Sequence, residues 1–128
     1  MSESRISPTE ALRLMNDEGY TYVDVRTKTE FALGHPAGAK NVPWVFQRTS
    51  GAQPNPQFVA TVEKEVGPDA KVIVGCHTSN RADKAAEALE TAGFSNVSVQ
   101  RAGWAGLRDS FGGVTEPGWE ELKLPIER

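Results

Sequence analysis

Short apolar runs alternate along the chain with segments that have helical spacing. Runs rich in β-branched and aromatic residues occupy 20–25, 71–75 and 96–100, and each predicts a strand. The run at 71–75 shows no polar alternation, which is typical of a central parallel strand covered on both faces. The segment 48–56 is rich in turn-forming residues and predicts an irregular surface loop. Because strands alternate with helical segments, the pattern predicts an α/β fold.

Capping residues and glycines mark the ends of the helical segments. The segment Ser7–Glu10 combines a good N-cap, proline at the first helical position and glutamate at the third, and Gly19 ends the pattern. Alanines and Leu89 follow Arg81 at helical spacing and stop at Gly93. We expect helices over about 8–18, 56–66, 81–92 and 102–110.

Length and composition narrow the class of protein. A chain of 128 residues is long enough for one domain, which we expect to span residues 1–128. The formal net charge of −3 and the pI near 5.4 give no general attraction for nucleic acid or for a membrane of anionic lipid. No apolar run approaches the roughly 20 residues that cross a bilayer, and the polar start Met1–Arg5 lacks a secretory signal. We therefore expect a cytoplasmic protein, or an organellar one if a presequence has been trimmed.

The single cysteine, Cys76, cannot form an internal disulfide. It directly follows the strand predicted at 71–75, and open α/β sheets bind their ligands at the carboxyl ends of such strands. A free cysteine is often merely a buried core residue. Here polar residues follow at once and a helix begins at about Arg81, which favours a reactive thiol.

Converging backbone amides can make such a thiol reactive, because the thiolate is the nucleophilic form. Lowering a thiol pKa by about 2 units takes about 2.7 kcal/mol, and one hydrogen bond to a charged group contributes about 1.5 to 3 kcal/mol. Hydrogen bonds from a few backbone amides therefore suffice to lower the pKa of the thiol by this amount. Arg81 adds a permanent positive charge that can bind an anionic donor or product. We expect Cys76 to be accessible and to have a lowered pKa.

The order of strand, Cys76, four residues, Arg81 and helix resembles the active-site loop of the rhodanese-like sulfurtransferases. Upstream, Val23–His35 and Gly38–Pro43 resemble the two segments that introduce the fold in that family. Downstream, Ala102–Trp104 resembles the turn that closes the family's domain. Because several motifs occur in the same order, the resemblance is specific.

This similarity covers about residues 6–112 and leaves 113–128 as a C-terminal extension. It implies a rhodanese-like three-layer α/β fold, with a central, mainly parallel, five-stranded sheet flanked by helices. It also implies a thiosulfate sulfurtransferase in which Cys76 cycles between thiolate and persulfide, with Arg81 as the second catalytic residue. Substrate binding is then assigned to the loop residues His77, Thr78, Ser79 and Asn80.

The resemblance further implies that the protein needs no cofactor and no metal. Its partners are then a small anionic sulfur donor, such as thiosulfate, and cyanide or a thiol as acceptor, with a sulfur-accepting protein as a further candidate. Ser79 stands where such loops often have glycine, and Leu107 where the family often has a second tryptophan. The sequence leaves open the rate, the physiological donor and acceptor, the pathway and the oligomeric state.

Alternative interpretations concern both the function and single residues. Protein tyrosine phosphatases use a similar loop with one more intervening residue, so a small phosphatase or an arsenate reductase is one alternative. A persulfide-sensing or sulfur-delivery module with little turnover is another. A metal site at Cys76, His77 and His35 is disfavoured, because two of these ligands are adjacent and structural zinc usually takes four. We interpret Asp24 and Arg26 as a structural salt bridge rather than as catalytic groups.

Three tryptophans have structural interpretations. Trp44 and Trp104 line the pocket or pack against the core, and the sequence does not decide between these roles. In the acidic tail at 116–128, we expect Trp119 and Leu122 to dock onto the domain.

Overall fold

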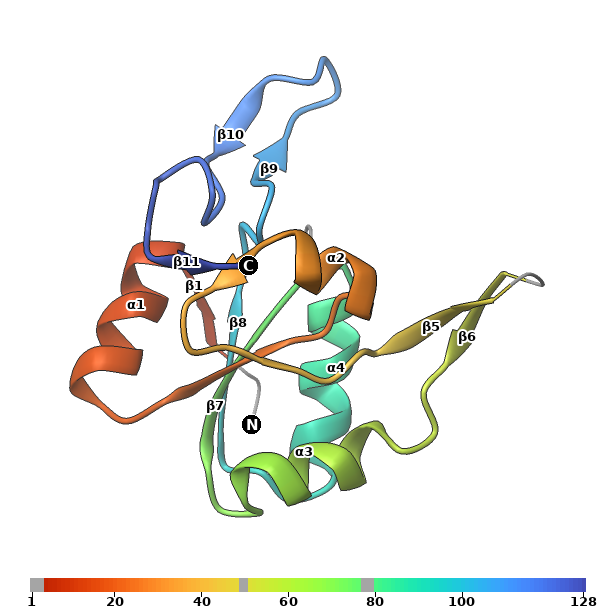
Figure 1. Ribbon diagram of the computed structural model, residues 1–128. Helices are drawn as coiled ribbons and strands as arrows, with labels where there is room; N and C mark the ends of the chain where they lie inside the picture. Colours follow the sequence, from red (N-terminus) through yellow and green to blue (C-terminus); the bar gives the residue numbers. More distant parts are fainter. Residues whose placement is uncertain (1–3, 49–50, 77–79) are drawn as a thin grey trace.

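The computed structural model describes residues 4–48, 51–76 and 80–128. Its centre is a five-stranded sheet in the order β1-β8-β7-β2-β4, in which every neighbouring pair is parallel (Figure 1). In that order, the strands are β1 (Ser4–Ile6), β8 (Asn96–Gln100), β7 (Lys71–Gly75), β2 (Thr21–Asp24) and β4 (Lys40–Asn41). The expected α/β fold with a five-stranded parallel sheet is confirmed.

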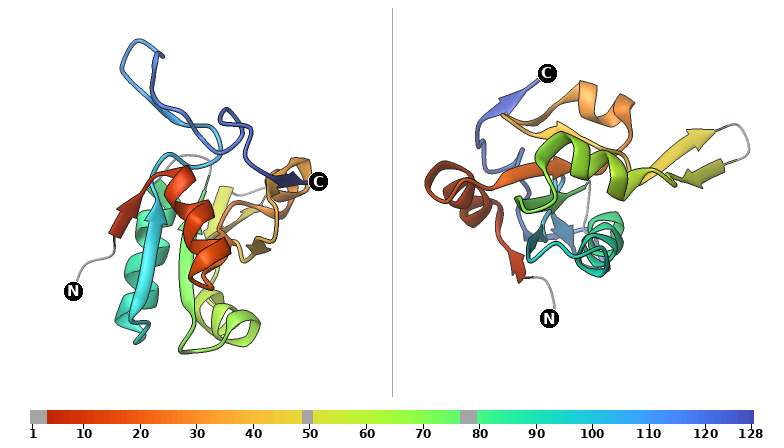
Figure 2. Two further views of the ribbon diagram at one scale, coloured as in Figure 1. Left: turned by 90° about the vertical axis from the view of Figure 1, so that its left-hand side faces the viewer. Right: turned by 90° about the horizontal axis from the view of Figure 1, so that it is seen from below.

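Helices cover both faces of this sheet and give the domain three layers (Figure 2). The described helices are α1 (Pro8–Asp17), α2 (Lys28–Leu33), α3 (Phe58–Val66) and α4 (Asn80–Thr91). Helices α3 and α4 cover one face, whereas α1 and the C-terminal segment cover the other. No helix in the described part of the chain is long and apolar enough to span a membrane.

Strand β7 divides its side chains between two cores. Val72 and Val74 join the core under α3 and α4, while Ile73 joins the core under α1, as the alternation of side chains in a strand requires. Both faces of β7 are therefore apolar, which explains the unbroken apolar run in the sequence. Trp104 belongs to the α1 core, and Trp44 packs against the other core.

The predicted start of α1 is present in atomic detail. The Ser7 side chain accepts a hydrogen bond from the Glu10 backbone N–H at 3.1 Å, and Pro8 is the first helical residue. The other helices expected over 56–66 and 81–92 also form, with boundaries within two residues of the prediction. Local capping and spacing therefore predicted these helices correctly.

The prediction of a helix over 102–110 is wrong. A turn occupies the first part, and β9 (Leu107–Arg108) then pairs antiparallel with β10 (Val114–Glu116). Gly103 and Gly106 have φ angles of 68° and 93°, which a right-handed helix cannot contain. These two glycines direct the chain into a turn instead.

The prediction of an irregular loop over 48–56 is wrong at Arg48 and over 51–54. Strands β5 (Val45–Arg48) and β6 (Gly51–Pro54) pair antiparallel and form an arm that projects from the domain (Figure 1). Turn-forming residues gave the sequence the appearance of a loop, but pairing between the two strands satisfies their backbone hydrogen-bonding groups.

The C-terminal extension folds back onto the domain. Strand β11 (Ile126–Glu127) pairs antiparallel with β3 (His35–Pro36). Trp119 is fully buried, and its Nε1 donates a hydrogen bond to the Pro125 carbonyl at 2.8 Å, so its expected docking is confirmed. Leu122 is 38% exposed, so its expected docking is wrong; Leu124 and Ile126 pack against the α1 core beside Trp119 instead.

Candidate functional site

The candidate site lies where β2 and β7 end side by side. Asp24 is in register with Gly75, and the Val25 N–H donates to the Gly75 carbonyl at 2.9 Å. Cys76 follows at once, and its own carbonyl accepts a hydrogen bond from the Trp104 N–H at 2.8 Å. The backbone of the cysteine is therefore fixed by both neighbouring segments at the carboxyl edge of the sheet.

Cys76 itself is buried, with 2% of its surface exposed. Burial raises the pKa of the thiol, while hydrogen bonds from the backbone N–H groups of Ala82 and Arg81 and the positive charge of Arg81 oppose that rise. The expectation of an accessible thiol with a lowered pKa is therefore wrong for the described part of the site. The physical reason is that Cys76 packs in the core under α3 and α4, where loss of solvation disfavours the thiolate.

The first turn of α4 directs two backbone N–H groups at this thiol. They belong to Arg81 and Ala82, close to the start of the helix at Asn80. Unpaired amides at a helix N-terminus favour an anion. His77, Thr78 and Ser79, which the sequence assigned to substrate binding, lie outside the described residues, and Asn80 is the first residue of α4.

The Arg81 side chain pairs with the carboxylate of Glu30, to which the sequence analysis gave no role. Arg81 Nη1 and Nη2 donate to Glu30 Oε1 and Oε2 at 2.9 and 3.2 Å. The side chains of Arg81 and Glu30 are 26% and 32% exposed. We call these two residues the rim pair. Glu30 lies near the start of α2, which follows β2, so α2 and α4 contribute one residue each.

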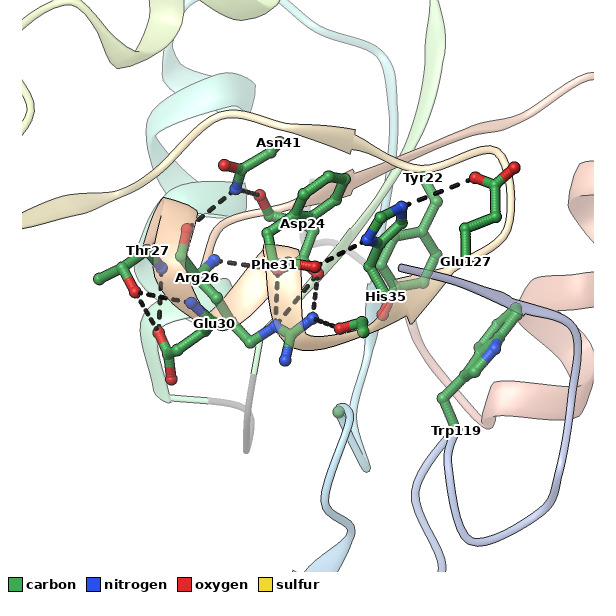
Figure 3. A network of polar contacts seen from close by, with 12 residues as sticks. Tyr22, Asp24, Arg26, Thr27, Glu30, Phe31, His35, Asn41, Trp119 and Glu127 are labelled. Carbon is green, nitrogen blue, oxygen red and sulfur yellow. Dashed lines mark hydrogen bonds and ion pairs between the residues drawn. The ribbon is translucent and has the colours of Figure 1, made fainter.

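Thr27 fixes Glu30 through a capping box at the start of α2. The Glu30 carboxylate accepts hydrogen bonds from Thr27 N at 2.9 Å and from Thr27 Oγ1 at 3.1 Å, while the Glu30 N–H donates to Thr27 Oγ1 (Figure 3). Partial burial opposes ionisation of Glu30, but the hydrogen bonds from Arg81 and Thr27 prevail and lower its pKa to about 2. The sequence signal was Thr27 with Glu30 three residues later, a spacing that is typical of a capping box.

A second ion pair, Asp24 with Arg26, lies at the same end of the sheet, since Asp24 is the register partner of Gly75, and we call it the buried pair. Arg26 Nε lies 3.0 and 3.1 Å from the two Asp24 oxygens, and Arg26 Nη2 donates to Asp24 Oδ2 at 2.8 Å and to the Gly34 carbonyl at 2.6 Å (Figure 3). The guanidinium also stacks over Trp104 at 4.9 Å, and Asn41 donates to the carbonyls of Asp24 and Arg26. The predicted salt bridge is therefore present.

His35 belongs to a separate contact with the C-terminal extension. Its Nδ1 lies 2.7 Å from the Phe31 carbonyl oxygen, and its Nε2 lies 3.6 Å from Glu127 Oε1 (Figure 3). The His35 ring also stacks on the Phe31 ring at 3.6 Å. These contacts join β3 to β11, and within the described ranges His35 is in no group of three side chains that could hold a metal ion.

A pocket of about 650 Å³ lies beside the site, between β4, the β5–β6 arm and the start of α3. Its walls include the apolar residues Val42, Pro43 and Phe46, and Lys28 and Asn55 are among its polar lining residues. Cys76 is not among the lining residues. This pocket is therefore distinct from the enclosure around the thiol.

Known proteins match this chain over most of its length. The family model named Rhodanese-like domain matches residues 7–110. Thiosulfate sulfurtransferase 16, chloroplastic, from Arabidopsis thaliana is 35% identical over 128 residues, which cover 98% of this chain and 97% of that protein. Senescence-associated protein DIN1 from Raphanus sativus is 35% identical over 120 residues, and the chain spans only 59% of that protein's length.

A solved structure shows the same fold. The crystal structure of Rv0390 from M. tuberculosis superposes with a TM-score of 0.82 at 26% sequence identity, covering 99% of this chain and 98% of that one. The family and the α/β fold that the sequence motifs indicated agree with these matches. This chain belongs to the family of rhodanese-like domains.

Proposed function

We propose that the protein is a sulfurtransferase that carries a sulfane sulfur on Cys76 as a persulfide, with thiosulfate or a similar anion as donor. The observation that carries the proposal is the placement of a single cysteine at the carboxyl end of β7, with the Arg81 and Ala82 N–H groups bonded to its thiol. The relative named thiosulfate sulfurtransferase, which matches this chain almost end to end, supports it.

In the proposed reaction, the Cys76 thiolate attacks the outer sulfur of thiosulfate. The new bond joins the two sulfurs, the sulfur–sulfur bond of the donor breaks, and sulfite leaves with that bond's electron pair. Cyanide or a thiolate then attacks the terminal sulfur of the persulfide, which gives thiocyanate or a new persulfide and returns the Cys76 thiolate. Such a double displacement predicts ping-pong kinetics.

The described residues support this chemistry in two ways. The N–H groups of Arg81 and Ala82 favour a negative charge on the thiolate and on the persulfide alike. The enclosure of Cys76 by the α3–α4 core also shields a bound sulfur from side reactions with water and stray thiols.

The test is the intact mass of the protein after treatment with thiosulfate in the absence of reducing agent. We expect the wild type to gain one sulfur atom and to lose it again on addition of cyanide, with formation of thiocyanate. Cys76→Ser is the matched control, since it differs by one atom and should gain nothing. A wild-type protein whose mass stays unchanged at saturating donor contradicts the proposal.

A second candidate function is a persulfide sensor or sulfur-delivery module with little turnover. The observation that favours it is the burial of Cys76, which raises the thiol pKa and limits access of an acceptor. The two functions differ in the rate at which the Cys76 persulfide passes its sulfur to an acceptor. A persulfide that forms but is not discharged by cyanide or small thiols indicates the sensor, whereas rapid discharge indicates the transferase. Release of phosphate from a phosphate ester would instead indicate the phosphatase alternative.

The acceptor and the location stay predictions. We propose a thiol or cyanide as acceptor, with a sulfur-accepting protein as a further candidate. The Arabidopsis relative carries the word chloroplastic in its name. The cytoplasmic location expected for this chain is a proposal that fractionation of cells expressing the tagged protein would test.

A further inference from the structure

The rim pair places an anionic side chain beside Arg81, whose positive charge acts on Cys76. Glu30 engages Arg81 through two hydrogen bonds, and about a quarter to a third of each side chain is exposed. The pair therefore lies where a donor in solution can reach it, in contrast to Cys76, which is only 2% exposed. An anionic donor that approaches Arg81 meets a guanidinium that already donates two hydrogen bonds to a carboxylate.

Glu30 is held in place and held ionised. Its carboxylate takes hydrogen bonds from Thr27 N and Thr27 Oγ1 as well as from Arg81. These contacts fix the side chain from the helix end on one side and from Arg81 on the other. Since the pKa of Glu30 is about 2, the carboxylate stays negative over the whole range in which the protein would work.

Arg81 acts on Cys76 at the same time. Its positive charge and its backbone N–H group both lower the pKa of the thiol against the effect of burial. One guanidinium thus serves two negative groups, the Glu30 carboxylate and the Cys76 thiolate. Any charge that neutralises Arg81 weakens its action on the sulfur.

We propose that Glu30 determines donor specificity as a built-in counter-charge to Arg81. This inference rests on the proposed sulfurtransferase function. Glu30 competes with the anionic end of the donor for the guanidinium, and its negative charge repels a donor in proportion to the donor's own charge. Compared with a site that lacks this charge, the wild-type site therefore shifts the preference from dianionic thiosulfate toward monoanionic sulfane donors, such as organic thiosulfonates.

The first test uses Glu30→Gln, which keeps an oxygen for Arg81 and Thr27 but removes the charge. We expect the ratio of kcat/KM for thiosulfate to kcat/KM for methanethiosulfonate to rise by roughly threefold to tenfold, mainly through KM. Glu10→Gln is the matched control, since Glu10 makes a similar two-bonded pair with Arg13 on α1, far along the chain from Cys76. An unchanged ratio in folded Glu30→Gln overturns the proposal.

The second test needs no sulfur transfer. Because Cys76 is the single cysteine, the pH dependence of alkylation by iodoacetamide reports its pKa directly. We expect Glu30→Gln to lower that pKa and Glu10→Gln to leave it unchanged. An unchanged pKa overturns the role of Glu30 even where sulfur transfer is intact, whereas a shifted pKa in a protein that takes up no sulfur overturns the proposed function.

The third test separates a charge effect from damage to α2. Thr27→Val removes the hydroxyl of the capping box and keeps the Glu30 carboxylate and its pair with Arg81, so it should leave the Cys76 pKa unchanged. If Thr27→Val shifts that pKa as much as Glu30→Gln does, Glu30 acts through the capping box and the proposal is overturned. Circular dichroism of each variant checks that the fold is retained.

Discussion

The buried pair and the rim pair lie at the same edge of the sheet and differ chiefly in their contact with solvent. Arg26 and Asp24 are 3% and 2% exposed, and the guanidinium also bonds a backbone carbonyl and stacks on Trp104. Arg81 and Glu30 are 26% and 32% exposed and lie beside the thiol. A buried ion pair with several hydrogen bonds serves the structure, whereas a partly exposed one remains available to a substrate.

The largest effect is expected from breaking the buried pair. Arg26→Met should lower the free energy of unfolding by about 3 to 5 kcal/mol, because it leaves the Asp24 carboxylate buried without its partner. Urea denaturation followed by tryptophan fluorescence measures the loss. The double variant Asp24→Asn/Arg26→Met should lose less than Arg26→Met alone. A loss no larger than that of the rim pair would remove the distinction between the two pairs.

The next largest loss of stability is expected from a substitution that disturbs the packing around the buried pair. A Cβ on Gly75, the register partner of Asp24, would lie 1.8 Å from Tyr22 Oη. Gly75→Ala should therefore cost about 1 to 3 kcal/mol of stability through overpacking. Gly113→Ala on the β9–β10 hairpin is the control, since its Cβ would meet only the Asp109 side chain, at 3.1 Å. Equal midpoints of thermal unfolding for Gly75→Ala and Gly113→Ala would contradict close packing at the carboxyl end of β7.

A smaller loss of stability, with a defined pH dependence, is expected when the rim pair is broken. Glu30→Gln should cost about 0 to 1 kcal/mol at neutral pH. The folded pKa of Glu30 is about 2, below its ordinary value, so its stabilisation is complete above the pKa of the unfolded chain. This stabilisation is lost as the pH falls toward 2. Stability curves of wild type and variant should thus converge in acid, and a gap that widens in acid contradicts the assignment.

The smallest effect is expected at the exposed pair of Glu10 and Arg13, whose side chains are 40% and 49% exposed. Glu10→Gln should leave the unfolding midpoint unchanged within error, because solvent and salt screen such a pair. Calorimetry in low and high salt measures this. A clear loss of stability that salt does not reduce would show that exposure is not what separates the three pairs.

Local signals in the sequence predicted much of the fold and the place of the site. The Val72–Val74 run predicted a strand covered on both faces, Ser7 predicted the start of α1, and Cys76 was placed correctly at the end of β7. The sequence missed α2, which has only six residues, although its capping residues were visible. It also missed both hairpins, because strand pairing depends on a partner segment and not on composition alone.

What the sequence determined by itself were the properties that neighbouring residues control: helix caps, strand burial on both faces, and the order of strand, cysteine and helix. Only the tertiary structure decided that Cys76 is enclosed and that Arg81 pairs with Glu30, which is 51 residues away along the chain. The reason is that desolvation and charge pairing depend on which distant segments meet in space. The sequence therefore located the thiol, and the fold set its pKa and its neighbours.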